Sequence, residues 1–175
     1  MANGSWDATD SVMGMYGWPE DWERKLAGQG CPMCDNLHRE ETEFGVRFVE
    51  GSWADVYLQR RSPLAGYAIA IWKRGHVAEP TELDEASAAG YWNDTLAGAR
   101  ALSRLLAPYK MNYLTMGNAV PHLHTHLLPR HAADPAPGKP FPWHLMEEAP
   151  AIPEPAFSDQ VSALRDLVRS GEPYP

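Results

Sequence analysis

Three of the seven histidines in this chain fall within five residues, at His122, His124 and His126. Side chains two residues apart on a β-strand point to the same face of the strand. The alternation therefore predicts a strand with three imidazoles on one face, and with Leu123 and Leu127 turned toward a core on the other. A solvated strand face that happens to carry histidine is the alternative without chemistry. Histidine is scarce in this chain, so a functional site is the stronger interpretation.

Alternating imidazoles fit two kinds of chemistry. Two of them can bind one zinc ion, with a third ligand from elsewhere and a water that becomes hydroxide. In the second kind, a neutral ring nitrogen attacks a phosphorus atom, while the other nitrogen donates its proton to an acceptor such as a backbone carbonyl. The residue types alone leave both interpretations open.

The two cysteines, Cys31 and Cys34, form a C-x-x-C pair, which is too few for a disulfide framework. A redox-active pair is disfavoured because AGQG precedes it and no βαβ pattern surrounds it. The pair is otherwise two buried thiols, or half of a structural zinc site that needs two more ligands. Candidates for those ligands are His38, His76 and one of the three clustered histidines.

The surrounding sequence predicts the elements that must position these residues. Residues 46–60 alternate and break at Gly51 and Ser52, which is typical of two strands joined by a turn. A 3.6-residue period predicts a long helix from Thr81 or Asp84 to Pro108. The apolar face of this helix is expected to contain Trp92, Leu96, Ala99, Leu102 and Leu106. Further strands are expected at 66–76, 111–118 and 119–130, with short helices at 19–28 and 158–171, the last capped by Ser158.

Short connections between the predicted strands favour antiparallel pairing, which gives an α+β fold. The expected architecture is a mostly antiparallel sheet with one long helix and extended termini. The length of 175 residues suits a single domain over 1–175. We divide it into an N-terminal extension (1–30), a core (31–130), and a proline-rich arm with a short C-terminal helix (131–175).

The charge of the chain argues against one class of partner. A net charge of -8 and a pI of about 5.3 are a poor match for a nucleic acid polymer. A local pocket can still bind a small anion. The sequence contains no signal-peptide pattern and no apolar stretch near the ~20 residues of a membrane span. We therefore expect a cytoplasmic protein that does not enter a membrane.

Four pieces of the sequence together resemble the histidine triad (HIT) superfamily. HLHTHLL at 122–128 resembles its signature of alternating histidines and apolar residues. GYAIAIWKRGH followed by AEPTEL resembles the strand that ends in a basic residue and histidine before the long helix. GNAVPHLHTHLLPR resembles the final strand of the family, and CPMC resembles the N-terminal pair of its zinc-bearing members. The resemblance covers residues 31–130.

This resemblance implies a HIT-like fold, a homodimer, and nucleotidyl transfer at the α-phosphate of a nucleotide. Family substrates are dinucleoside polyphosphates, nucleoside phosphoramidates or nucleotide sugars. By position, His124 is the expected nucleophile that forms a nucleotidyl-histidine, and His126 contacts the phosphate and the leaving group. His122 is expected to orient His124 or to bind zinc. The uridylyltransferase branch implies a structural zinc ion on Cys31, Cys34, His76 and His122.

Other positions carry weaker implications of the same resemblance. Asn118 stands where many members have glutamine, so its amide is an expected substrate contact, and Asn112 resembles an asparagine near the ribose or phosphate. Tyr67 and Trp72 depart from the histidine and proline that members often carry. Gly75 is an extra residue before His76, which bears on the zinc geometry.

Two competing functions remain on the sequence alone. The first is a non-catalytic nucleotide-binding or zinc-stabilised interaction protein that keeps the fold. The second is a metal-dependent hydrolase with zinc on the three histidines themselves, although an HxHxDH arrangement is missing. Within the arm, Lys139 and Trp143 are candidate contacts for a polyphosphate and a base. The alternative is a proline-stiffened arm that packs on the sheet or on a dimer partner. Arg130 is expected to pair with a phosphate or to form a surface salt bridge. Trp6, Trp18 and Trp22 are expected in the core or an interface.

Overall fold

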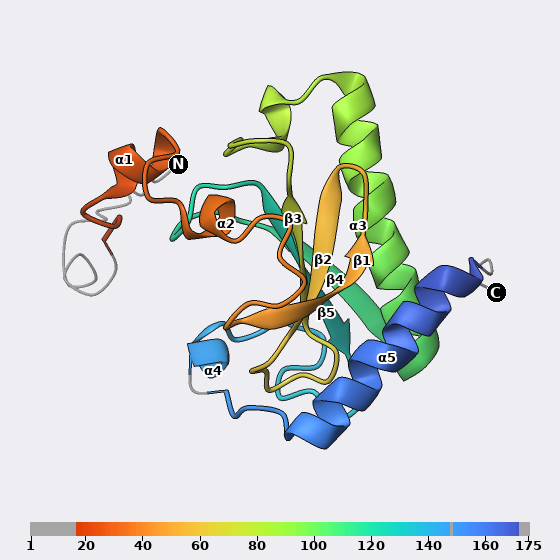
Figure 1. Ribbon diagram of the computed structural model, residues 1–175. Coiled ribbons are helices and arrows are strands. Elements are labelled where there is room, and N and C mark those ends of the chain that lie inside the picture. The colour runs from red at the N-terminus through yellow and green to blue at the C-terminus, as the bar shows by residue number, and fades with distance from the viewer. Residues whose placement is uncertain (1–16, 148, 172–175) are drawn as a thin grey trace, which may run out of the picture.

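The computed structural model describes residues 17–147 and 149–171 (Figure 1). Trp6 therefore lies outside the described residues. Five strands form one antiparallel sheet in the order β1-β2-β3-β5-β4. Their bounds are Gly45–Glu50 (β1), Ala54–Gln59 (β2), Ala68–Trp72 (β3), Lys110–Thr115 (β4) and His124–Arg130 (β5). The α+β class and the antiparallel sheet predicted from the sequence are confirmed.

The predicted hairpin at 46–60 is confirmed as β1 and β2, which turn at Gly51. Gly51 donates its N–H to the carbonyl of Ala54, and an added Cβ there would lie 2.3 Å from that oxygen. Asp94 fixes the same turn from the long helix by accepting the backbone N–H groups of Trp53 and Ala54, at 2.6 and 3.0 Å. The hairpin is thus held against the helix as well as by strand pairing.

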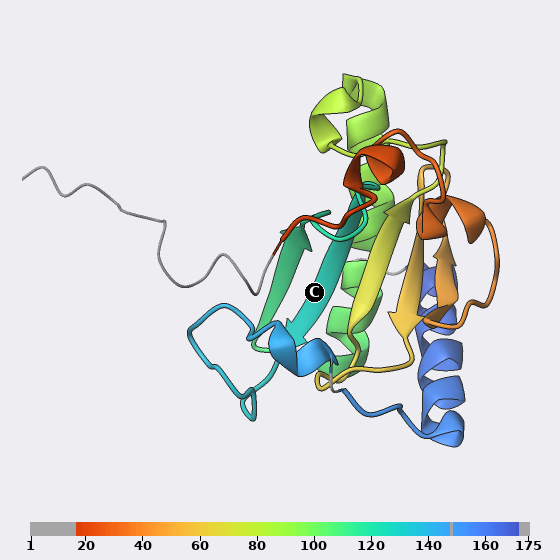
Figure 2. The ribbon, with the colours of Figure 1, turned by 90° about the vertical axis from the view of Figure 1, so that its left-hand side faces the viewer.

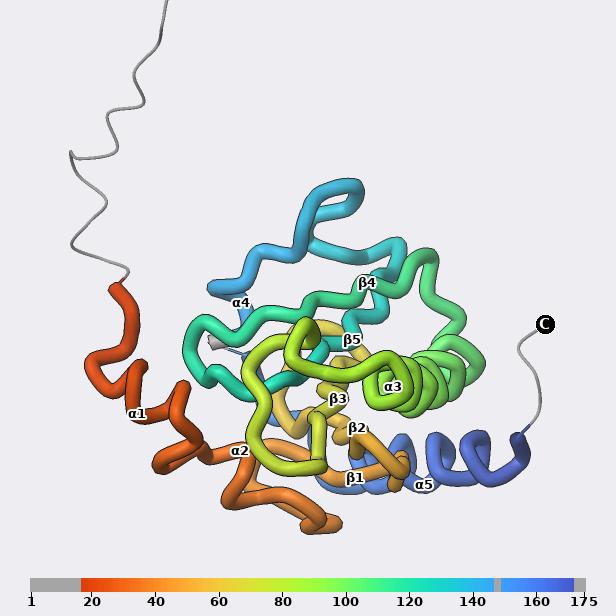
Figure 3. Tube along the Cα trace, turned by 90° about the horizontal axis from the view of Figure 1, so that it is seen from above, coloured from red at the N-terminus to blue at the C-terminus, as the bar shows by residue number. Residues whose placement is uncertain are grey.

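Two helices cover one face of the sheet (Figure 3), namely α3 (Glu85–Leu106) and α5 (Glu154–Ser170). Asp84 caps α3 by accepting the N–H of Ser87 at 2.7 Å. Ala107 ends it in the left-handed region, directly before Pro108. Leu102 of α3, Leu164 of α5 and Leu127 of β5 are fully buried in one hydrophobic core between helices and sheet.

Two details of these helices differ from the sequence-based expectation. Trp92 is 38% exposed, and Tyr91 is buried in its place, because the helix turns Tyr91 toward Trp72 and Thr125. Ser158 lies inside α5 rather than at its cap. The helix begins one turn earlier, at Glu154, with a proline in its first turn. Proline is tolerated there because the N–H groups of a first turn make no hydrogen bond within the helix.

Within the described part of the chain, the opposite face of the sheet carries only short elements (Figure 2). They are α1 (Trp22–Leu26), α2 (Pro32–Asp35) and α4 (His144–Glu147), with a 3-10 turn η1 (Pro80–Glu82) before α3. Trp18 is 66% exposed and packs on Trp22 with ring centroids 4.5 Å apart, so it does not belong to the core. No helix of the described segments is long and apolar enough to cross a membrane. The division of the chain at residues 30 and 130 stays a prediction.

Candidate active site and metal centre

The three clustered histidines do not share one face of a strand. β5 begins at His124, so His122 precedes the strand and takes a different direction. His124 and His126 lie on the face opposite α3, next to Ile71 and Ile69 of β3. Thr125 points the other way and meets the Tyr91 hydroxyl at 2.7 Å. The prediction of one shared face therefore holds for two histidines and is wrong for His122.

His122 instead lies with Cys31, Cys34 and His76 in a tight cluster. The Sγ atom of Cys34 lies 3.4 Å from Nδ1 of both histidines, and the Sγ atom of Cys31 lies 3.6 Å from Nδ1 of His122. All four potential ligand atoms lie within 4.8 Å of one another. A tetrahedral zinc ion, with Zn–S of about 2.3 Å and Zn–N of about 2.1 Å, holds sulfur and nitrogen ligands roughly 3.6 Å apart. The cluster therefore has the size of a zinc site.

The outer nitrogens of both cluster histidines are already engaged. Nε2 of His122 donates to the carbonyl of Trp72 at 2.8 Å, and Nε2 of His76 donates to the carbonyl of Leu26 at 3.2 Å. A proton on each Nε2 leaves the lone pair of each Nδ1 pointing into the cluster, which is the tautomer that a metal requires. Burial raises the pKa of the Cys34 thiol to about 12, and the neighbouring Cys31 adds to the rise. Two thiolates fit there only beside a cation, so the residues present suit zinc.

His124 and His126 form a different arrangement, a chain of hydrogen bonds along the sheet. Nδ1 of His124 donates to the carbonyl of His122 at 2.6 Å, which leaves the lone pair of His124 on Nε2. Nε2 of His126 lies 3.1 Å from that atom and must carry the proton between them. The Tyr67 hydroxyl then donates to Nδ1 of His126 at 2.7 Å. A single set of tautomers satisfies every contact in this relay.

The surroundings of the relay keep its imidazoles neutral. Burial lowers the pKa of His126 to about 3, and the pKa of His124 is lowered for the same reason. Burial likewise lowers the pKa of His122 to about 4. Burial also raises the pKa of Tyr67, so its hydroxyl keeps the proton that the relay uses. The sequence marked Tyr67 only as a departure from the family, and its hydroxyl contact with His126 was missed.

A cavity of about 220 Å³ opens beside the relay. Its floor includes Ile69 and Ile71, which pair with His126 and His124 in the sheet. Further walls come from β2 and from the segment around α2, with Met33, Leu37, Phe44 and Val120 among the apolar side chains. Asp55, Tyr57 and Gln59 of β2 also line it, and sequence analysis assigned no role to any of them. Their alternation along β2 was the available signal.

The arm after β5 packs on the same face of the sheet. Phe141 joins Leu64, Tyr67 and Leu128 in a small hydrophobic cluster, and Trp143 meets the edge of the His126 ring with centroids 4.8 Å apart. The packing alternative for the arm is thus confirmed. In addition, Trp143 contacts the relay.

The two asparagines predicted to contact substrate have different surroundings. Oδ1 of Asn112 accepts a hydrogen bond from Nη1 of Arg130 at 2.6 Å, on the face of β4 that carries Leu114 beside His126. Arg130 pairs with Asp134 as the salt-bridge alternative predicted, but the pair is buried rather than at the surface. Asn118 is exposed in the loop between β4 and β5 and lines a hollow of about 180 Å³ with Trp18 and other residues.

Comparisons with known proteins agree with this geometry. A family model described as HIT domain matches residues 52–133. A histidine triad protein from Bradyrhizobium japonicum is 25% identical, with a TM-score of 0.66 over 75% of this chain and 96% of that chain. Two more distant structures are similar in fold alone. They are a Zn-bound histidine triad family protein from Mycobacterium smegmatis (19% identity, TM-score 0.58, 81% and 94% covered) and a diadenosine triphosphate hydrolase from Plasmodium falciparum (13%, 0.54, 78% and 89%).

The search of curated proteins gives no match. The family model, the structural neighbours and the HLHTHLL segment on β5 nevertheless point the same way. The chain thus carries a HIT domain at residues 52–133, and its fold is that of histidine triad proteins.

Proposed function

We propose that the protein is a nucleotide hydrolase or nucleotidyl transferase that acts at the α-phosphate through a nucleotidyl intermediate on His124. The observation that carries the proposal is the relay from Tyr67 through His126 to His124, which leaves the lone pair of His124 on Nε2. A nucleophilic imidazole must present one bare nitrogen while its other nitrogen holds a proton in place. The backbone carbonyl of His122 supplies that second contact.

The reaction proceeds in two displacements. Nε2 of His124 attacks the α-phosphorus, a new N–P bond forms, and the bond from phosphorus to the leaving group breaks with its electron pair on the leaving group. Nε2–H of His126 lies beside the attack point and donates to a phosphate oxygen or to the leaving group. Water then attacks the nucleotidyl-histidine and releases the nucleoside monophosphate. In a transferase, a second phosphate takes the place of water.

Zinc has a structural part in this proposal. Cys31, Cys34, His76 and His122 hold it, and when bound it ties the N-terminal segment to the start of β5. Because the carbonyl of His122 accepts from Nδ1 of His124, a fixed His122 also fixes the direction of His124. One neighbour in fold is described as Zn-bound, which supports zinc as the metal. Two thiols committed to a metal suit a reducing compartment, so we place the enzyme in the cytoplasm.

The substrate class follows from the cavity and the neighbours. An apolar cavity beside His124 and His126 suits the base of a nucleotide, because flat aromatic rings bury well against aliphatic side chains. One structural neighbour is a diadenosine triphosphate hydrolase. We therefore propose dinucleoside polyphosphates or nucleoside phosphoramidates as substrates, with Asn118 as a contact to the phosphates.

We also propose a homodimer that forms along β4. This strand is at the edge of the sheet, and Tyr109 and Tyr113 are 84% and 41% exposed there. An exposed edge strand with aromatic side chains suits pairing with a second copy. Light scattering during gel filtration tests this, with a mass of twice 19.5 kDa expected.

The geometry argues against zinc on the three histidines. Among the described residues, the group of four that can hold a metal takes His122 away from His124 and His126. A non-catalytic nucleotide-binding protein would have no use for the relay.

The test is release of nucleoside monophosphate from diadenosine tri- and tetraphosphate and from adenosine and guanosine phosphoramidate. We expect release by the wild-type protein and by His144→Ala, a histidine exposed in the arm. Release should be lost in His124→Ala, by roughly a thousandfold or more. Equal rates in His124→Ala and wild type would disprove the nucleophile. Binding without any release would favour the non-catalytic alternative.

A further inference from the structure

One carboxylate side chain lines the cavity beside the relay. Asp55 of β2 lines it, although the residue is only 1% exposed. In the sheet, Asp55 lies between Ile71 of β3 on one side and strand β1, which carries Arg47, on the other. A buried carboxylate is costly unless it has partners. The presence of a carboxylate at this buried position therefore needs a physical explanation.

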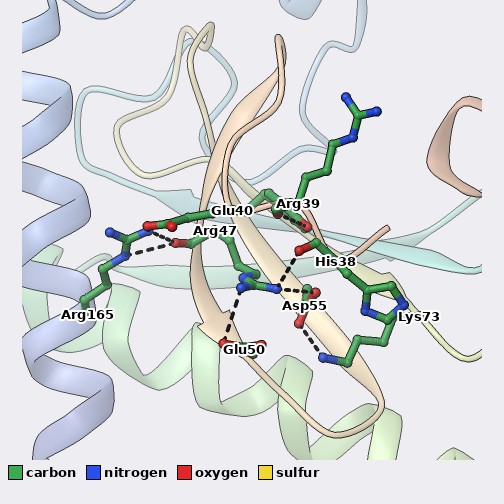
Figure 4. A network of polar contacts seen from close by, with 9 residues as sticks. His38, Arg39, Glu40, Arg47, Glu50, Asp55, Lys73 and Arg165 are labelled. Carbon is green, nitrogen blue, oxygen red and sulfur yellow. Dashed lines mark hydrogen bonds and ion pairs between the residues drawn. The ribbon is translucent and has the colours of Figure 1, made fainter. Parts of the chain in front are cut away.

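The carboxylate has two cationic partners, one on each side (Figure 4). Oδ1 accepts from Nζ of Lys73 at 2.9 Å, and Oδ2 accepts from Nη1 of Arg47 at 3.1 Å. Neither Lys73 nor Arg47 lines the cavity. The two cations thus fix the carboxylate from outside the cavity. Each oxygen of an ionised carboxylate has two acceptor sites, so one remains on each oxygen.

The position of Asp55 relative to the nucleophile suggests what it meets. Ile71 pairs with His124 on one side and with Asp55 on the other, so Asp55 lies two strands from His124. Neighbouring strands lie about 4.8 Å apart, which puts Asp55 about 10 Å from His124 across the sheet. A ribose and a base together span a distance of that order from the α-phosphate. The group that reaches Asp55 is therefore the outer edge of the base.

The walls around Asp55 also favour a base over a sugar. Met33, Leu37, Ile69 and Ile71 surround the cavity with aliphatic surface, which suits a flat ring. The lining also includes Asn36, Thr42, Tyr57 and Gln59, so the preference for a base rests on the aliphatic surface and on the distance from His124.

A paired carboxylate discriminates strongly among the bases. Guanine presents N1–H and the N2 amino group side by side, two donors that match the two oxygens of a carboxylate. Adenine and cytosine place an acceptor nitrogen beside their single amino group, and that nitrogen faces the carboxylate unfavourably. Uracil offers one N–H between two carbonyl oxygens. Only guanine satisfies both oxygens of Asp55.

We propose that Asp55 makes the nucleoside cavity selective for guanine, so that the substrates of this enzyme are guanine nucleotides. This inference rests on the proposed nucleotidyl function, because it takes the α-phosphate to lie at His124. Lys73 and Arg47 are positioning residues in this scheme. They hold the carboxylate and do not touch the base.

The experiment measures the dissociation constants of GMP, IMP, AMP, CMP and UMP for the zinc-loaded protein by calorimetry. IMP is GMP without the N2 amino group, so the pair tests a single contact on the unaltered protein. We expect GMP to bind about tenfold to a hundredfold more tightly than AMP, as a bidentate pair does, and about tenfold more tightly than IMP. Equal binding of GMP, IMP and AMP would overturn the inference while leaving the proposed function intact. No binding of any of the five would overturn both.

A pair of variants separates Asp55 from the rest of its ion-pair network. Asp55→Asn keeps the shape of the side chain but replaces one acceptor with a donor, so the preference for GMP over IMP should fall to within about twofold. Glu50→Gln removes a charge from the same network, because Glu50 pairs with Arg47 but is 71% exposed and lies outside the cavity. It should leave the preference unchanged. If Asp55→Asn weakens all five nucleotides equally, the carboxylate contacts the ribose and the inference is wrong. If Asp55→Asn does not fold, the comparison of GMP with IMP on the wild-type protein decides alone.

Discussion

His122 and His124 are two residues apart in the chain, yet they use opposite ring nitrogens. Nε2–H of His122 donates a hydrogen bond to the carbonyl of Trp72, and Nδ1 of His122 points toward the cysteines. Nδ1–H of His124 donates a hydrogen bond to the carbonyl of His122, and Nε2 of His124 points toward His126. One backbone hydrogen bond thus decides which lone pair is available and in which direction. The same side chain is thus suited to bind a metal in the first case and, in our proposal, to act as a nucleophile in the second.

The two regions also differ in what they require. The cluster of Cys31, Cys34, His76 and His122 joins three separate segments of the chain, so it bears mainly on stability. In the relay, His124 and His126 lie on β5 and Tyr67 directly precedes β3, and the sheet already holds these two neighbouring strands together. Changes in the relay should therefore reduce activity at nearly constant stability, and changes in the cluster should do the reverse.

After the loss expected for His124→Ala, the largest expected effect on activity is at His126. His126→Ala removes the N–H beside the attack point, so nucleotide release should fall by about 10²- to 10⁴-fold. Zinc content, measured by atomic emission, should stay that of the wild type, because His126 does not touch the cluster. Loss of zinc in this variant would mean that the two regions are not separate.

The largest expected effect on stability is at Cys31. Cys31→Ser should abolish bound zinc and lower the free energy of unfolding by at least about 3 kcal/mol, a part of the 10–16 kcal/mol that a structural zinc site can supply. His38→Ala is the matched control. His38 was a candidate ligand on sequence grounds, but it is exposed and does not belong to the cluster. Urea unfolding that gives the same midpoint for both variants would contradict the metal site.

A smaller effect is expected at Tyr67. Tyr67→Phe removes the donor to Nδ1 of His126 and frees the imidazole to adopt the wrong tautomer, so kcat should fall about tenfold. The free energy of unfolding should fall by about 1 kcal/mol, as for one buried hydrogen bond. Tyr91→Phe is the control on the opposite face of the sheet, where the hydroxyl bonds to Thr125. Tyr91→Phe should lower the free energy of unfolding by a similar amount and leave kcat unchanged. If kcat falls equally in Tyr91→Phe and Tyr67→Phe, Tyr67 has no specific role in the relay.

The smallest expected effects distinguish the two asparagines. Asn118→Ala should raise KM for a nucleoside phosphoramidate by roughly fivefold, by loss of one hydrogen bond to a charged group. Asn112→Ala should change KM less than twofold and lower stability by about 1 kcal/mol, because its oxygen is bonded to Arg130. If steady-state kinetics show a larger rise in KM for Asn112→Ala than for Asn118→Ala, Asn112 rather than Asn118 contacts the phosphate.

The sheet, the long helix and the four members of the cluster were predictable because each rests on local pattern or on family resemblance. Alternation marked β1, β2 and β3, and the 3.6-residue period marked α3. The extra Gly75 does not prevent His76 from reaching the cluster. It has a positive φ of 91°, a conformation that suits a glycine in a tight turn.

The parts that escaped prediction depend on contacts between distant segments. Tyr67 meets His126 only because β3 pairs with β5, and Asp55 reaches the cavity only because β2 lies beyond β3. The departure of His122 from the strand face depends on the cysteines nearly ninety residues earlier. Period-two alternation along one segment carries no information on such tertiary contacts.

The central claim is a two-step transfer through His124, and the stereochemical course at the α-phosphorus tests it most directly. A guanosine phosphoramidate with a chiral, oxygen-isotope-labelled α-phosphorus would be hydrolysed by the wild-type protein and the product configuration determined. Each in-line displacement inverts the phosphorus, so attack by His124 followed by water predicts overall retention. Inversion would show that water attacks directly and would contradict a nucleophilic His124.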